Sequence, residues 1–231
     1  MSPSTRQRSR MPKQRNNSTW VFVGLVLAIV AAFIVAIVLS QSKSTAAEIG
    51  PKVKVSGQPL SAYVGPDKPD TAIGQQVPEV SGHSLSGKSL TIGKPGQPTV
   101  YAFLAHWCPH CQAEVPVLVQ LHKSKNWPSN VALQGIATAT NTLRDNYPPS
   151  NWLSNENWPG QVLADDKSGG AGQTFGLTGY PYLVFVDKDG KLAGRTSGEV
   201  PQAELQTLVT ALSKGKPLPS VATGASSSTS G

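Results

Sequence analysis

The two cysteines of this chain constrain its fold and its chemistry more than any other feature. Cys108 and Cys111 are the only cysteines among 231 residues, and they stand three positions apart. An apolar run of strand length at residues 99–105 leads directly into them, and apolar residues at helical spacing follow over 112–122. The pattern predicts a buried strand that ends where a helix begins, with both thiols at the junction.

A cysteine pair in this position favours redox chemistry over a structural role. Unpaired N–H groups and the helix dipole stabilise a thiolate at a helix N-terminus, so Cys108 is the expected nucleophile. Cys111, one turn further on, is expected to resolve the mixed disulfide. A zinc site needs four ligands and the chain has no second cysteine pair, whereas a structural disulfide framework would spread more cysteines along an exported chain. We therefore expect a working dithiol that needs no cofactor and no metal.

The N-terminal part of the sequence predicts a membrane anchor at residues 20–40. Residues 20–39 carry no charge, and at about 1.5 Å per residue they would span about 30 Å as a helix. The run exceeds the apolar region of a signal peptide, which favours an uncleaved anchor, although cleavage near residues 44–47 stays open. Five basic residues and no acidic residue precede it, so the positive-inside rule places the tail at 1–19 in the cytoplasm and the rest outside.

The net charge of +7 does not indicate a nucleic-acid partner. Five of the 20 basic residues lie in the tail, and the 15 that remain after residue 40 face 13 acidic residues, or +2. No basic run with interleaved aromatic residues is present there. The expected partners are exported proteins with thiols or disulfides, a membrane redox protein that recycles the pair, and the membrane through the chain's own anchor.

Composition divides the remainder into three parts. Residues 41–70 are rich in Ser, Lys, Pro and Gly and predict a flexible linker, whereas the Ser-rich residues 216–231 predict a disordered tail. The globular domain is expected at 71–215. Its predicted elements are a hairpin over 84–92, strands at 131–137, 183–186 and 191–196, a helix from residue 142 interrupted by Pro148-Pro149, another short helix near Trp152, and a closing helix from Pro201.

The active-site motif carries a family resemblance. The pattern W-C-x-x-C-x-x-E-x-P-x-L is met by Trp107, Cys108, Cys111, Glu114, Pro116 and Leu118, and Gly179-Tyr180-Pro181 and Asp187-Lys188-Asp189-Gly190 follow. Over about residues 75–212 the chain resembles the thioredoxin fold, most closely the TlpA/ResA-like membrane-anchored thiol–disulfide oxidoreductases. The resemblance implies an α/β fold, a three-layer sandwich with a central mixed sheet flanked by helices and an N-terminal hairpin. It also implies that Pro181 is cis, faces the disulfide, bars metal capture and presents the backbone beside it to a peptide.

Departures from the family pattern bear on the direction of electron flow. The dipeptide Pro109-His110 resembles that of the oxidising DsbA-type proteins, so His110 is expected to favour the Cys108 thiolate and strengthen the disulfide as an oxidant. Tyr180 stands where threonine is common, and the buried carboxylate of thioredoxins would fall at Ala102. An oxidant that forms disulfides is favoured, and a reductant of apocytochrome c or other exported proteins is the alternative.

Other residues near the motif allow more than one interpretation. Trp107 either shields the disulfide or packs in the core, and Glu114 either relays a proton when buried or is a surface charge. His106 is either a solvated surface residue, a tuning charge or a substrate contact. In a different functional class, the two thiols with His106 or His110 would hold Cu(I) as a metallochaperone. A thiol peroxidase is disfavoured because the Thr-x-x-Cys type of site is missing.

Overall fold

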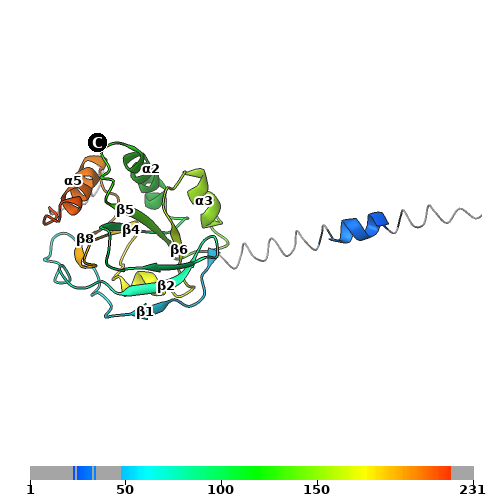
Figure 1. The fold of residues 1–231 in the computed structure, drawn as a ribbon, viewed down its shortest axis with the longest axis horizontal. Helices are drawn as coiled ribbons and strands as arrows, with labels where there is room; N and C mark the ends of the chain where they lie inside the picture. The colour runs from blue at the N-terminus through cyan, green and yellow to red at the C-terminus, as the bar shows by residue number, and fades with distance from the viewer. Residues whose placement is uncertain (1–22, 24, 33, 35–47, 220–231) are drawn as a thin grey trace, which may run out of the picture. The chain divides into compact units, whose positions relative to one another are not determined.

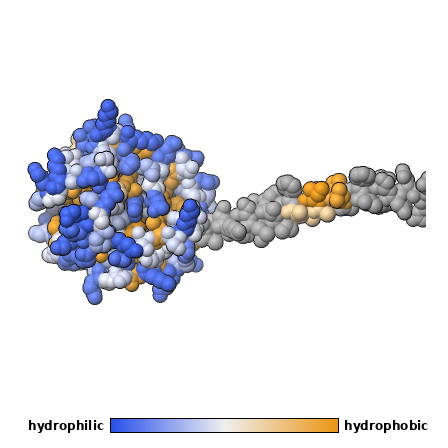
Figure 2. All heavy atoms as spheres, in the orientation of Figure 1, coloured by the Kyte–Doolittle hydropathy of each residue, from blue (hydrophilic) through white to orange (hydrophobic). Residues whose placement is uncertain are grey.

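The computed structural model describes residues 23, 25–32, 34 and 48–219. The chain divides into two units, Met1–Lys43 and Ser44–Gly231. The described residues of the first unit are helical and expose apolar side chains, among them Leu25 and Ile29 (Figure 2). Among the described residues, no helix has the length and apolar character needed to cross a membrane. Most of the anchor predicted at 20–40, and the whole tail at 1–19, lie outside them.

A mixed eight-stranded sheet organises the described part of the second unit (Figure 1). Its strand order is β1-β2-β6-β5-β4-β7-β8, and β3 pairs with β2 beside this path. The central strand β4 pairs in parallel with β5 and antiparallel with β7. The strands are β1 (Lys54–Ser56), β2 (Glu79–Ser84), β3 (Ser89–Ile92), β4 (Thr99–Leu104), β5 (Ala132–Ala137), β6 (Val162–Ala164), β7 (Tyr182–Val186) and β8 (Leu192–Ser197).

Two hydrophobic clusters hold the sheet between them. Strand β4 is buried along its whole length, and its side chains alternate between the two faces. On one face Val100, Ala102 and Leu104 pack in the cluster that includes α2 (Pro109–Lys123), α3 (Pro149–Asn155) and α5 (Gln202–Ser213). On the other face Tyr101 and Phe103 pack with α4 (Gly170–Thr174) and the β2–β3 hairpin. The predicted central mixed sheet flanked by helices is confirmed.

The strands and helix nearest the cysteines agree with the sequence patterns. The hairpin, the strands at β4, β5, β7 and β8, and the closing helix α5 all form, with ends that differ by a few residues. The helix predicted to start at residue 142 is wrong, because the structure has turns up to Pro148, whereas the short helix predicted near Trp152 forms as α3 over Pro149–Asn155. Asn141 accepts a hydrogen bond from the Leu143 N–H at 2.9 Å, a local turn that competes with a helix start.

The flexible linker predicted at 41–70 is wrong for residues 48–70. Strand β1 pairs with β2, Leu60 and Tyr63 are buried, and Asp70 pairs with Arg195 at 2.6 Å. A composition rich in Ser, Pro and Gly predicts flexibility only when tertiary contacts are missing, and here such contacts are present. Residues 41–47 lie outside the described part.

The tail predicted at 216–231 is described only up to residue 219. Its Leu218 packs against the cluster that contains α2 and α5, and its side chain lies close to Gly194 on β8. Leu218 is therefore part of the packed domain, which extends past the predicted end at residue 215. Residues 220–231 lie outside the described part.

The pairing of Asp70 with Arg195 predicts that the segment before residue 71 stabilises the domain. The Arg195 side chain is 1% exposed, and its Nε and Nη2 atoms donate to both carboxylate oxygens of Asp70 at 2.6 and 2.8 Å. We expect Asp70→Asn to lower the free energy of unfolding by roughly 3 kcal/mol, because it leaves a buried guanidinium without its counter-charge. Urea denaturation measures this. The exposed Asp67→Asn is the control, and equal effects of the two variants would contradict the prediction.

Candidate active site

The chain places Cys108 at the N-terminal cap of α2. Pro109 occupies the first helical position, where its lack of an N–H costs nothing, and the Gln112 N–H donates to the Cys108 carbonyl at 3.1 Å. No side chain caps this end of the helix, and its first turn holds no acidic residue. Cys108 and Cys111 are both buried free thiols. The positive end of the helix is therefore available to stabilise a thiolate on Cys108.

Cys111 lies deeper than Cys108 and is fully buried. Burial raises the pKa of the Cys111 thiol, although the Ala105 N–H donates to its sulfur at 3.4 Å. Cys111 is thus held in its protonated form when the pair is reduced. This arrangement agrees with the predicted division of roles, in which Cys108 attacks and Cys111 resolves.

Glu114 lies one helical turn beyond Cys111 and is almost fully buried. Its Oε2 atom accepts a hydrogen bond from the Val200 N–H at 3.0 Å, and its Oε1 atom has no partner among the described residues. Burial raises the pKa of Glu114 to about 7, and the nearby Glu199 carboxylate contributes in the same direction. Glu114 is therefore a buried carboxyl and not a surface charge. With this pKa it can exchange a proton near neutral pH.

His110 lies at the surface and pairs with a residue that the sequence did not single out. Its Nδ1 atom is 2.6 Å from Oε1 of Glu199, with both side chains largely exposed. Glu199 belongs to the connection between β8 and α5, 89 positions away. No sequence motif marks this residue, because only the folded chain brings the two together.

Three successive residues between β8 and α5 each contact a different part of the site. The Gly198 N–H donates to the Pro181 carbonyl at 2.8 Å, Glu199 pairs with His110, and the Val200 N–H donates to Glu114. We call residues 198–200 the bridging segment. It fastens the proline loop and the first turns of α2 to one another.

Pro181 follows a cis peptide bond, as the family resemblance implies. The Tyr180 ring before it is partly buried and lies 6.1 Å from the Trp107 ring in an edge-on arrangement. Burial also raises the pKa of the Tyr180 hydroxyl. The structure thus brings Tyr180 and Pro181 to the same end of the sheet as the cysteines, because β7 pairs with β4 in the register Tyr182 to Phe103.

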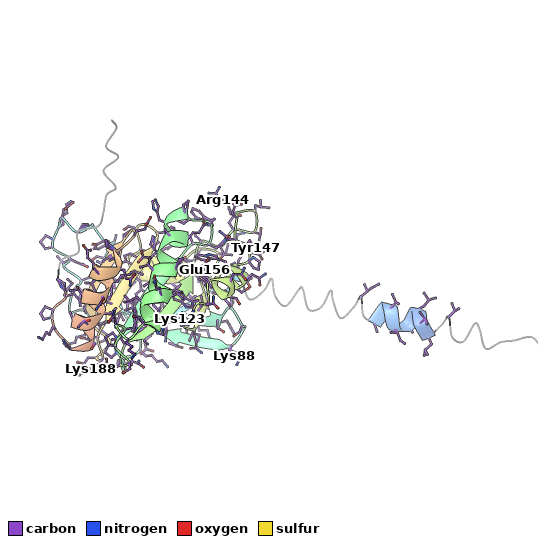
Figure 3. The ribbon with its side chains drawn as sticks, turned by 90° about the horizontal axis from the view of Figure 1, so that it is seen from above. Lys88, Lys123, Arg144, Tyr147, Glu156 and Lys188 are labelled. Carbon is purple, nitrogen blue, oxygen red and sulfur yellow. The ribbon has the colours of Figure 1, made fainter. Side chains whose placement is uncertain are left out.

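Trp107 is held on several sides. Its Nε1–H donates to the Ala139 carbonyl at 2.9 Å, and the Arg144 guanidinium lies 5.0 Å from the centre of its ring. In Figure 3, Arg144 and Tyr147 lie near one end of α2 and Lys123 lies at the other. The loop over residues 139–147 therefore contacts Trp107 next to the cysteine end of the helix, and the partly buried Trp107 ring packs against the core. Shielding of the disulfide by Trp107 stays a prediction.

His106 is buried, so the prediction of a solvated surface residue or a tuning charge is wrong. The Asn141 N–H donates to its Nε2 atom at 3.1 Å, which makes Nδ1 the protonated nitrogen and the donor to the Asp145 carbonyl at 2.7 Å. Burial lowers the pKa of His106 and keeps it neutral. Its role in the structure is to hold the loop that carries Arg144.

The site offers few ligands for a metal ion. No group of three or more His, Cys, Asp or Glu side chains that could hold one exists among the described residues. Both ring nitrogens of His106 are engaged, and His110 is engaged by Glu199. These contacts argue against His106 as a ligand in the metallochaperone interpretation, whereas the two thiols and the Nε2 atom of His110 are not excluded by them.

Comparison with known proteins places this geometry in a family. The family model described as Redoxin matches residues 72–212, more than half of the chain. The chain belongs to the redoxin family. A homolog of the thiol:disulfide interchange protein DsbE from Paracoccus denitrificans is 31% identical over 134 residues, covering 56% of this chain and 69% of that protein. A TxlA homolog from Synechocystis is 28% identical over 124 residues, and the chain spans 54% of its length.

A solved structure has the same fold as this redoxin. A putative thiol:disulfide interchange protein DsbE from Chlorobium tepidum superposes with a TM-score of 0.51 at 21% identity, covering 61% of this chain and 97% of that one. The predicted thioredoxin-like α/β fold is confirmed. The expected enzyme class, a thioredoxin-like thiol–disulfide oxidoreductase, agrees with the family and with the names of the curated relatives. The finer likeness to the TlpA/ResA-like branch stays a prediction.

The raised pKa of Glu114 predicts a pH dependence of stability. Its pKa is about 7 in the folded chain against an ordinary 4.5, so between these values the folded state binds more protons than the unfolded state. The free energy of unfolding therefore falls as pH rises through this range. Glu114→Gln removes the effect, so its stability relative to wild type should rise by roughly 2 to 3 kcal/mol from pH 5 to pH 8.

Urea denaturation of the reduced protein at the two pH values measures this difference. Glu156→Gln, a change of the same kind at the end of α3, is the control and should leave the difference near zero. If Glu114→Gln changed the free energy of unfolding by the same amount at pH 5 and at pH 8, the Glu114 carboxyl would have an ordinary pKa. That result would contradict the prediction.

Proposed function

We propose that this redoxin exchanges a Cys108–Cys111 disulfide with the cysteines of exported proteins, chiefly as an oxidant that introduces disulfides. One observation carries the proposal: a buried dithiol stands at the uncapped start of α2, with Pro181 beside it and the buried Glu114 one turn beyond. Such a site can receive an extended substrate segment along the backbone next to Pro181.

The oxidation proceeds through a mixed disulfide. A substrate thiolate attacks the Cys108 sulfur, the disulfide breaks, and Cys111 leaves and takes up a proton. Glu114, with a pKa of about 7, is positioned to supply that proton from its buried carboxyl. A second substrate thiolate then attacks the substrate sulfur of the mixed disulfide, and Cys108 leaves as a thiolate. The substrate loses two electrons and two protons. The cysteine pair gains the two electrons and one proton on Cys111, one released proton restores Glu114, and the other goes to solvent.

The oxidising direction is supported by the groups around Cys108. A thiolate is the leaving form of Cys108, and both the start of α2 and a protonated His110 favour it. Stabilising the reduced form in this way makes the disulfide a stronger oxidant.

A reductant is the second candidate. The Glu199 carboxylate lies against the His110 ring, where it offsets a positive charge on that ring, and the motif around the cysteines resembles that of the TlpA/ResA-like proteins. As a reductant, the Cys108 thiolate would attack a substrate disulfide and Glu114 would accept the proton of Cys111 before the latter closes the bond. Apocytochrome c or another exported protein would be the substrate.

The proposed location is outside the cytoplasm, on the membrane. The uncharged run at 20–39 and the basic residues before it support a single-pass anchor with a cytoplasmic N-terminus. A membrane redox protein would then return the pair to its working state after each exchange.

Trapping of the mixed disulfide in cells tests both the chemistry and the location. In the full chain, Cys111→Ser leaves Cys108 free to attack but removes the resolving thiol, so partner proteins should accumulate as disulfide-linked adducts. Non-reducing gels and mass spectrometry of the adducts measure this. Cys108→Ser is the matched control and should accumulate at least tenfold fewer adducts, because Cys111 lies deeper than Cys108 and burial raises the pKa of its thiol. Adducts composed of cytoplasmic proteins, or equal trapping by both variants, would contradict the proposal.

A further inference from the structure

We propose that Glu199 is a positioning residue that limits the oxidising strength of the Cys108–Cys111 disulfide by neutralising His110. The proposal rests on the function proposed above and deepens it, because it names the residue that sets how strongly the site oxidises. Neither the motif nor the family match points to Glu199, which lies far from the cysteines in sequence.

The argument begins with the charges at the start of α2. The helix presents its positive end to Cys108, and its first turn contains no acidic residue. His110 lies in that turn, so its protonated ring adds positive charge where the helix already favours an anion. Glu199, from the connection after β8, supplies the negative charge that α2 itself lacks, at 2.6 Å from the His110 ring. The Glu199 carboxylate and a Cys108 thiolate therefore compete for the same cation.

This competition changes the free energy of the reduced state much more than that of the oxidised state. A thiolate on Cys108 exists only in the reduced pair, whereas the disulfide carries no charge. A cation next to Cys108 stabilises the reduced form alone, and an anion that occupies this cation removes part of that stabilisation. Glu199 therefore shifts the equilibrium toward the disulfide, which makes the chain a weaker oxidant than its Cys-Pro-His-Cys motif alone predicts.

The backbone keeps Glu199 in this position. The residues on either side of it donate hydrogen bonds into the site, Gly198 to the Pro181 carbonyl at 2.8 Å and Val200 to Glu114 at 3.0 Å. Exposed ion pairs are weak when both partners are free to move, and an anchored backbone reduces that freedom for Glu199. Two further ionisable groups of the site are held by other contacts: Glu114 accepts the Val200 N–H, and the Arg144 guanidinium lies against the Trp107 ring.

The redox equilibrium with glutathione tests the inference. The full chain, purified in detergent, is equilibrated at pH 6, where an ordinary histidine is mostly protonated. Relative to wild type, Glu199→Gln should raise the equilibrium constant for reduction by glutathione about three- to tenfold, because a positive charge on the His110 ring then acts on a Cys108 thiolate without compensation. Asp189→Asn removes the same charge from the turn that follows β7, at the end of that strand away from Pro181, and should stay within about twofold of wild type.

A double-variant cycle with His110→Ala separates action through His110 from any other effect. In the His110→Ala background, the effect of Glu199→Gln should shrink to less than about twofold. An unchanged or lowered constant in Glu199→Gln, or a shift of equal size with and without His110, would overturn the inference. All of these results are ratios between variants, so they stand whether the wild-type chain proves an oxidant or a reductant.

Discussion

The junction between β4 and α2 is the constraint on which the rest of the site depends. Six consecutive buried residues fix β4 at the centre of the sheet, with a hydrophobic cluster on each face. Because the strand cannot shift without exposing one of these faces, the chain that leaves it is fixed in position as well. Cys108 is thereby held at the first turn of α2, where an uncapped helix end favours a thiolate.

The remaining parts of the site come from distant segments and are joined by the backbone. The bridging segment, residues 198–200, contacts Pro181, His110 and Glu114 within three residues. One side of the site thus places a buried acid whose pKa lies near neutrality next to the deeper thiol. The other side places the paired side chains of His110 and Glu199 at the first turn of α2, the turn that follows the outer thiol. In the proposed mechanism, Glu114 transfers the proton and His110 affects the redox strength, and one short segment contacts both side chains.

Local patterns were sufficient for the central elements of the fold and for the two cysteines. The run before Cys108 and the spacing after Cys111 predict β4 and α2, because burial on both strand faces and one helix face leaves a clear periodicity. Residues 48–70 show the opposite case. Their composition predicts a linker, but Leu60, Tyr63 and Asp70 are held by contacts with residues more than a hundred positions away, which no local pattern reveals. The burial of His106 and the contact of Glu199 with His110 also depend on residues that are distant in sequence. For this reason His106 was misjudged and Glu199 was missed.

The equilibrium redox potential of the wild-type pair tests the central claim most directly, and equilibration with glutathione buffers at pH 7 measures it. The account describes an oxidant whose strength Glu199 moderates, so it predicts a potential above about −200 mV, between those of thioredoxin and DsbA. A value near −270 mV, that of thioredoxin, would contradict this account and make the chain a reductant.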